Sequence, residues 1–211
     1  MPGLVHVVDD DASFRTAIER RLRHAGYQVE THPSAQHLLD CLPGSAEMPG
    51  CILLDVQMPG LTGLDLQNRL VELGSILPVV FVTGHSDIPT TVRAIKAGAE
   101  DFLTKPIPSE QLIAAIERAL ARCDLARSQQ AELESFLALI ATLTPRERQV
   151  FDLIVRGRLN KQIAAELGTT ERTIKAHRHQ VMEKMQAHSL AELVSRTVRM
   201  GVLVPDTNSG R

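Results

Sequence analysis

The sequence predicts an α/β domain built on a doubly wound parallel sheet, followed by a helical segment and a small all-α domain. From the start of the chain to about residue 122, short apolar runs alternate with amphipathic stretches, as expected for successive strand–helix units. Polar residues follow several of these runs directly. Residues 143–205 instead show four short stretches of helical periodicity, bounded by glycines and capping residues.

Five strands and five helices account for the first domain. The runs at 4–8, 27–30, 52–54, 78–82 and 101–103 predict the strands. Phe14, Ile18 and Leu22 recur at a spacing of four and predict a helix over 12–25. Further helices are expected at 34–42, 64–73 and 88–97, with a fifth beginning at Ser109. One sequence does not give the strand order, and we take a flavodoxin-like order as the working expectation.

The totals limit the class of protein. The chain has 211 residues, enough for one large or two modest domains, and its apolar share of 44% supports packed cores. No stretch resembles a membrane span or a signal peptide, so we expect a cytoplasmic protein. Cys41, Cys51 and Cys123 are odd in number and lack CxxC spacing. We expect reduced packing thiols rather than a disulfide or a zinc site.

The charge is distributed unevenly along the chain. Residues 142–211 contain 12 Lys and Arg against 7 Asp and Glu, a net charge of +5. Residues 1–141 contain 11 against 18, a net of −7, which gives −2 for the whole chain. This asymmetry indicates different partners for the two halves. A basic domain alone is weak support for DNA binding, since solvated basic surfaces are common.

Polar side chains follow the predicted strands at their carboxyl ends. Asp9 and Asp10 follow the first strand, Asp55 the third, Thr83 the fourth and Lys105 the fifth. Parallel sheets hold their ligands at this edge. Clustered carboxylates favour a divalent cation such as Mg²⁺, beside which Asp55 can attack a phosphoryl group. Each residue alone has an ordinary explanation, as a helix cap, a turn hydroxyl or a solvated charge. Their joint placement favours a site.

Four motifs give this half a resemblance to a known family. They are Val7-Val8-Asp9-Asp10-Asp11, Leu53-Leu54-Asp55-Val56-Gln57-Met58-Pro59-Gly60, Val82-Thr83-Gly84-His85 and Lys105-Pro106. In combination they resemble the receiver domain of two-component response regulators over residues 1–122. The resemblance implies that Asp55 accepts phosphate from a histidine kinase. It also implies a Mg²⁺ site, or a site for another divalent cation, made by Asp10, Asp9, Asp55 and the backbone carbonyl of Gln57.

The same resemblance implies roles for three further residues. Thr83 and Lys105 would stabilise the phosphoryl group, and Thr83 and Phe102 would form a conformational switch. Asp11 stands where the family often has Glu or another residue. We expect an ordinary helix cap there rather than a third metal ligand.

Residues 123–142 predict a helical linker. They lack Pro and Gly and can extend the helix that begins at Ser109. Leu133, Leu137 and Ile140 follow a four-three spacing, but scarcely two heptads are present. We expect a solvated linker helix, and a short dimer contact that forms on activation is the alternative.

Helix start signals divide the last domain into four helices. Thr144-Pro145-Arg146-Glu147 and Ser189-Leu190-Ala191-Glu192 each read as a capping box. Asn160 is expected to cap a second helix over 161–167, and Thr170 a third over 171–185. Two short helices joined by a glycine-containing turn, the second bearing basic residues, match a helix-turn-helix. A four-helix bundle with a charged surface is the alternative.

Three segments of this half resemble the LuxR-type DNA-binding domain of the FixJ and NarL regulators. They are Leu143-Thr144-Pro145-Arg146-Glu147, Asn160-Lys161-Gln162-Ile163-Ala164 and Thr173-Ile174-Lys175-Ala176-His177-Arg178. The resemblance implies that double-stranded DNA is bound by seven residues: Lys175, Arg178, Thr173, Glu171 and His179 in the major groove, and Lys161 and Arg172 at phosphates. It also implies that Leu190, Leu193 and Val194 make a dimer contact. Residues 206–211 are expected to fray.

The sequence therefore predicts a phosphorylation-switched transcription regulator. Its expected partners are a cognate histidine kinase, DNA, a second copy on activation, and RNA polymerase. A phosphatase using an aspartyl intermediate is a rival, but Gln57 stands where such enzymes have a second Asp. A constitutive DNA-binding protein is another rival, and RNA binding a third. His177 and His179 are two apart on a helix and make a poor chelating pair.

Overall fold

The computed structural model describes residues 3–42, 49–84 and 88–202. It divides into two compact units, Met1–Ser128 and Gln129–Arg211, and the division falls within the predicted linker. None of the helices in these ranges is long and apolar enough to cross a membrane. The residues expected to fray, 206–211, lie outside the described ranges.

The first unit is a five-stranded parallel sheet. Its strands are β1 (Leu4–Val8), β2 (Gln28–His32), β3 (Gly50–Asp55), β4 (Val79–Thr83) and β5 (Asp101–Thr104). Their order is β2-β1-β3-β4-β5, which confirms the flavodoxin-like expectation. The three inner strands are buried along their whole length, whereas the edge strands β2 and β5 expose some residues. The predicted runs differ from the strands by one or two residues at their ends.

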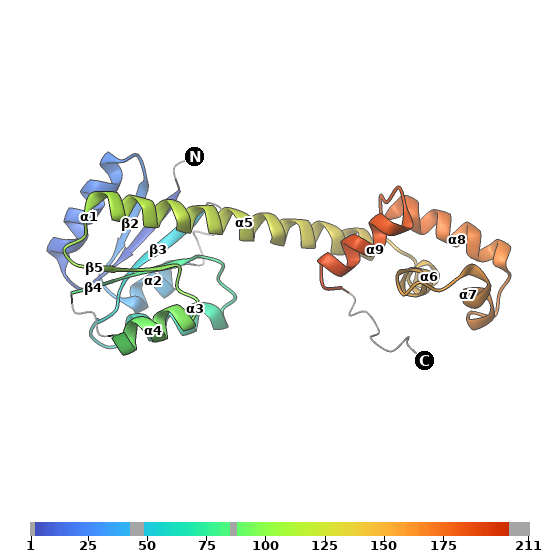
Figure 1. Ribbon diagram of the computed structural model, residues 1–211, viewed down its shortest axis with the longest axis horizontal. Coiled ribbons are helices and arrows are strands. Elements are labelled where there is room, and N and C mark those ends of the chain that lie inside the picture. The colour runs from blue at the N-terminus through green and yellow to red at the C-terminus, as the bar shows by residue number, and fades with distance from the viewer. Residues whose placement is uncertain (1–2, 43–48, 85–87, 203–211) are drawn as a thin grey trace. The chain divides into compact units, whose positions relative to one another are not determined.

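Helices cover both faces of this sheet (Figure 1). One face is covered by α1 (Ala12–His24) and the first part of α5 (Ser109–Ala141), through Ile18, Leu22, Leu112 and Ile116. The other face is covered by α2 (Ala35–Cys41), α3 (Gly63–Glu72) and α4 (Ile88–Lys96). Because both faces are covered, the apolar runs need no alternation of polar residues.

Parallel pairing aligns the carboxyl ends of the strands. Val8 pairs with Leu54, Asp55 with Val82, and Thr83 with Thr104. Asp9, which follows β1, and Lys105, which follows β5, therefore lie at the same edge of the sheet as Asp55.

The second unit packs the end of α5 against four helices. These are α6 (Pro145–Val155), α7 (Asn160–Glu166), α8 (Glu171–Lys184) and α9 (Leu190–Arg199). Phe136 and Ile140 of α5 join the core of this unit. The expectation of a solvated linker therefore holds for Leu125 and Leu137, which are 60% and 46% exposed, and is wrong for Phe136 and Ile140. Their burial follows from the helical spacing of four, which puts both on one face.

The three cysteines are reduced, but their surroundings differ. Cys51 and Cys123 are buried, as expected of packing thiols, and burial raises the pKa of Cys51 to about 12. Cys41 is exposed at the end of α2. The expectation of a packing thiol is wrong for Cys41.

Candidate functional site

Lys105 connects two carboxylates that are far apart in the sequence. Its Nζ lies 2.6 Å from Oδ2 of Asp9 and 3.2 Å from Oδ1 of Asp55. Asp9 and Asp55 are almost completely buried, with 1% and 6% of their surface exposed. The strand ends thus bring together three of the residues that the sequence singled out.

Asp55 is held at the end of β3 by its own backbone surroundings. The backbone N–H of Gln57 donates to its Oδ2 at 3.1 Å. Its Oδ1 faces Lys105. The side chain of Gln57 is exposed and takes no part in this contact.

The acidic residues after β1 have distinct positions. Asp9 accepts a hydrogen bond from the backbone N–H of Asp11 at 2.9 Å, whereas Asp10 is exposed. Asp11 is the N-cap of α1 and accepts from the N–H groups of Ser13 and Phe14. The prediction that Asp11 is a helix cap is confirmed.

Burial and charge set the protonation behaviour of the pocket. Burial raises the pKa of Asp55, and the neighbouring Asp9 raises it further against the opposing effect of Lys105. Burial would lower the pKa of Lys105, but its hydrogen bond to Asp9 and the charges of Asp55 and Asp9 outweigh this and raise it. Lys105 therefore stays an ammonium at neutral pH, close to a carboxylate that is costly to ionise.

The donor set suits a hard divalent cation. Asp9, Asp10, Asp55 and the Gln57 carbonyl offer only oxygen ligands, which Mg²⁺ prefers. The pKa of Asp55 is raised although Lys105 lies beside it, so the ammonium compensates the negative charge of Asp55 only in part. A cation beside these oxygens would supply the missing compensation.

The predicted switch residues, Thr83 and Phe102, lie on the neighbouring strands β4 and β5. Thr83 ends β4 and is 2% exposed. Phe102 is half-buried in β5, with its ring centroid 6.4 Å from that of Phe81. Their coupled movement stays a prediction.

Three residues near this site were not predicted from the sequence to belong to it. The Arg15 guanidinium donates to the backbone oxygen of Asp9 at 2.6 Å, and Lys105 Nζ lies 3.9 Å from the centre of the Phe14 ring. Phe14 and Arg15 both lie in the first turns of α1. A Cβ on Gly63 would lie 2.3 Å from the backbone oxygen of Asp55, so this position requires glycine. The spacing of four that Phe14 shares with Ile18 and Leu22 predicted a helix but not its contact with Lys105.

The second unit presents a polar helix surface on α8. Six of the predicted DNA contacts are exposed: Glu171, Arg172, Thr173 and Lys175 in the first turns of α8, His179 further along α8, and Lys161 on α7. Ile174 and Val181 anchor the opposite face in the core. Thr170 caps α8 as predicted, accepting from the N–H of Thr173.

Asn160 behaves differently from the prediction. It is the first residue of α7, and the N-cap is Leu159, whose backbone N–H donates to Oε1 of Gln162 at 2.9 Å. The prediction that Asn160 caps α7 is wrong, because its Oδ1 accepts from Arg178 at 3.1 Å instead. Arg178 is half-buried, and its bond to Asn160 links α8 to α7. Its contact with DNA stays a prediction.

The predicted dimer contact on α9 needs one correction. Leu193 is fully buried in the core of its own unit and is unavailable to a partner. Leu190 and Val194 are half-buried, and Val198 is 48% exposed. Ser189 accepts from the N–H of Glu192, but the Glu192 carboxylate accepts from His188, so only half of the second predicted capping box forms.

Comparison with known proteins matches both units. Residues 5–117 match the response regulator receiver domain, and residues 141–197 match the bacterial regulatory proteins of the luxR family. The chain is 43% identical to the transcriptional regulatory protein FixJ of Bradyrhizobium diazoefficiens, over 95% of this chain and 97% of that protein. The chain belongs to the LuxR-type response regulators. This response regulator controls transcription, with a receiver domain followed by a DNA-binding domain.

Two other relatives agree with this assignment. The response regulator protein TodT of Pseudomonas putida is 42% identical over 94% of this chain and 86% of its own. The solved structure of the response regulator StyR has a TM-score of 0.76 at 45% identity, covering 94% of this chain and 100% of the other. These similarities span nearly the whole response regulator and therefore include both of its units.

Proposed function

We propose that a histidine kinase phosphorylates Asp55 and that the phosphorylated protein dimerises and binds specific DNA sites. The proposal rests chiefly on the position of Lys105, whose Nζ lies 2.6 Å from Asp9 and 3.2 Å from Asp55. Replacing the Lys105–Asp55 contact by one between Lys105 and a phosphoryl oxygen requires little movement. The protein itself transfers phosphate only onto and off Asp55 and turns over no external substrate.

The chemistry is a phosphoryl transfer to a carboxylate. One oxygen of Asp55 forms a bond to phosphorus, and the bond from phosphorus to the donor imidazole nitrogen breaks with its electron pair passing to that nitrogen. The Lys105 ammonium and the Thr83 hydroxyl would stabilise the phosphoryl oxygens. When bound by Asp10, Asp9, Asp55 and the Gln57 carbonyl, Mg²⁺ supplies charge neutralisation.

Phosphorylation of Asp55 would affect the DNA-binding unit through movements of Thr83 and Phe102. Drawing Thr83 toward the phosphoryl group vacates space that Phe102 can fill, which would repack the surface of α4, β5 and α5. Dimers would then place two α8 helices at half-sites about one DNA turn apart. Leu190 and Val194 of α9 remain the proposed dimer contacts, and DNA-bound dimers would contact RNA polymerase.

Five residues are proposed to face bases: Lys175, Arg178, Thr173, Glu171 and His179. Lys161 and Arg172 are proposed to contact phosphates. Phosphate contacts give affinity that falls with salt but carry no sequence information. Removing one such contact should reduce the slope of log K against log salt by about 0.9. A Lys161→Ala variant tests this directly, while Lys175→Ala should relax specificity.

Labelling with acetyl phosphate tests the phosphoacceptor. Wild type should gain one phosphoryl group in the presence of Mg²⁺, detected by mass, and Asp55→Asn should gain none. Asp65→Asn is the matched control, because Asp65 is an exposed carboxylate on α3. Labelling of Asp55→Asn at the wild-type level would refute the assignment.

DNA binding tests the switch separately. Duplexes selected from a random pool by the wild-type protein with beryllofluoride should bind more weakly when beryllofluoride is omitted. Asp55→Asn should lose this difference and keep the basal affinity. Equal binding in both conditions would favour a constitutive DNA-binding protein.

A further inference from the structure

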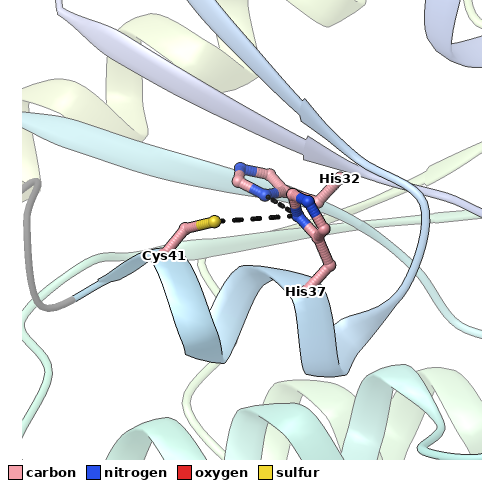
Figure 2. A group of neighbouring side chains, drawn as sticks. All are labelled: His32, His37 and Cys41. Atoms are coloured by element: carbon pink, nitrogen blue, oxygen red, sulfur yellow. Dashed lines mark hydrogen bonds between the residues drawn. The ribbon is translucent and has the colours of Figure 1, made fainter.

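Three histidines and a cysteine form a continuous group at the edge of the sheet formed by β2, where the backbone N–H of Asp9 donates to the backbone oxygen of His32 at 3.2 Å. His6 lies in β1, His32 ends β2, and His37 and Cys41 lie on α2. Nδ1 of His6 is 3.2 Å from Nε2 of His32, and Nδ1 of His32 is 3.0 Å from Nδ1 of His37. Sγ of Cys41 is 3.8 Å from the same nitrogen of His37. Figure 2 shows the side chains of His32, His37 and Cys41 converging.

The spacing of these atoms is that of metal ligands. One ring nitrogen each of His32 and His37 and the sulfur of Cys41 all lie within 4.8 Å of one another. Tetrahedral Zn²⁺, with bonds of about 2.0–2.1 Å to nitrogen and 2.3 Å to sulfur, places its ligand atoms about 3.3–3.6 Å apart. The measured separations of 3.0 and 3.8 Å bracket this range.

The hydrogen bond between His32 and His6 also suits a ligand role for His32. Nε2 of His32 lies 3.2 Å from Nδ1 of His6. When Nε2 carries the proton and donates to Nδ1 of His6, the lone pair of His32 Nδ1 points toward His37 and Cys41. Metal-binding histidines commonly use a partner in this way to fix their tautomer.

We propose that His32 Nδ1, His37 Nδ1 and Cys41 Sγ bind one zinc-class transition metal ion, with water as the fourth ligand. Binding releases the Cys41 thiol proton to solvent, and the proton of His37 moves from Nδ1 to Nε2 through water. The mixed nitrogen and sulfur donors select Zn²⁺ over Mg²⁺. His37 and Cys41 are exposed and give the ion access from solvent.

A second group, His6, Glu30 and His32, also has the necessary spacing. This second group uses the other ring nitrogen of His32. Neutral His32 has a free lone pair on only one of its two nitrogens, so it can serve one group or the other but not both. The second group lacks a thiolate, and two of its members are buried. His6 is therefore assigned to orienting His32 rather than to binding the ion.

Cobalt substitution tests the proposal on the full-length protein. Co²⁺ should bind in a one-to-one ratio, give a thiolate-to-metal charge-transfer band and tetrahedral d–d bands, and be displaced by Zn²⁺. Cys41→Ser should abolish the charge-transfer band. His37→Ala should weaken Zn²⁺ binding by more than the roughly 10–100-fold caused by loss of an outer partner.

Matched controls make the result decisive. His24→Ala removes an exposed histidine on α1 outside the group and should bind Co²⁺ like wild type. Because His37 and Cys41 are exposed, their variants should fold, which circular dichroism can verify. Absence of a thiolate band in wild type, or its persistence in Cys41→Ser, would overturn the proposal. Unchanged Zn²⁺ affinity in His37→Ala would also overturn it and leave a hydrogen-bonded chain of imidazoles.

Discussion

Lys184 donates a hydrogen bond of 2.6 Å to the carboxylate of Glu147, which ties the end of α8 to the first turn of α6. Glu147 also accepts from the backbone N–H of Thr144 at 2.8 Å and completes the capping box predicted from the sequence. The bond to Lys184, followed by that to Thr144, lowers the pKa of Glu147 to about 2. The orientation of α8 is thus linked to one ionised carboxylate.

The first prediction concerns Glu147 and acid. Because its pKa is lowered in the folded state, its stabilising contribution is present above about pH 4.5 and is lost as the pH falls toward about 2. Wild type should exceed Glu147→Gln in stability at neutral pH, and the difference should vanish near pH 2. Chemical denaturation, monitored by far-ultraviolet circular dichroism, measures the free energy of unfolding of the two proteins. A stability difference between wild type and Glu147→Gln that does not depend on pH would contradict the stabilising role of ionised Glu147.

The second prediction concerns the receiver unit. Burial lowers the pKa of His6 and of His32 to about 4, so protonation favours the unfolded chain. The unit should lose stability as the pH falls from about 6.5 to about 4. The chain has one tyrosine, Tyr27, and no tryptophan, so tyrosine fluorescence reports this unit alone. Measurements need a chelator to exclude metal.

His6→Phe should show a shallower dependence on pH in that window, because it removes one of the two groups that protonate. His24→Ala should match wild type, since His24 is exposed. Constant stability of the wild-type unit between pH 6.5 and 4 would show that these imidazoles can be charged in the folded state.

The third prediction is that Asp55→Asn stabilises the receiver unit. The raised pKa of Asp55 means that its ionised form costs stability at neutral pH, and a neutral amide removes this cost. We expect a gain of a few degrees in melting temperature at pH 7. The gain should disappear in acid, where wild-type Asp55 is protonated. Asp65→Asn should instead destabilise, because Asp65 belongs to the capping box of α3.

The fourth prediction concerns Gly63. An added methyl would meet the backbone oxygen of Asp55 at 2.3 Å and the Phe81 ring at 3.0 Å. Gly63→Ala should therefore lower stability by about 1–3 kcal/mol, as overpacking does, and slow labelling by acetyl phosphate. Gly84→Ala is the matched control, since its Cβ would meet nothing within 4 Å. Equal stability of the two variants would refute the close approach.

The sequence predicted the fold and the pocket for a physical reason. Asp9, Asp55 and Lys105 follow apolar runs, and parallel pairing necessarily brings the ends of such runs to one edge. The capping residues Asp11, Thr144 and Thr170 were predicted correctly because their partners lie two or three residues away.

Contacts between distant elements were not predictable in this way. Arg15 donates to the backbone oxygen of Asp9 only because α1 packs back against the sheet. Asn160 accepts from Arg178 only because α7 and α8 pack closely. The group of His6, His32 and His37 depends on which strand pairs with β1. Such neighbours are set by tertiary packing, which no local pattern contains.

The 33-residue helix α5 contributes to two separate hydrophobic cores, with Leu112 and Ile116 in the first and Phe136 and Ile140 in the second. A DNA-binding fragment that starts at residue 143 would lose one aromatic and one aliphatic side chain, Phe136 and Ile140, from its interior. Fragments intended for separate expression should instead be divided near residue 128, so that each keeps its own share of the helix.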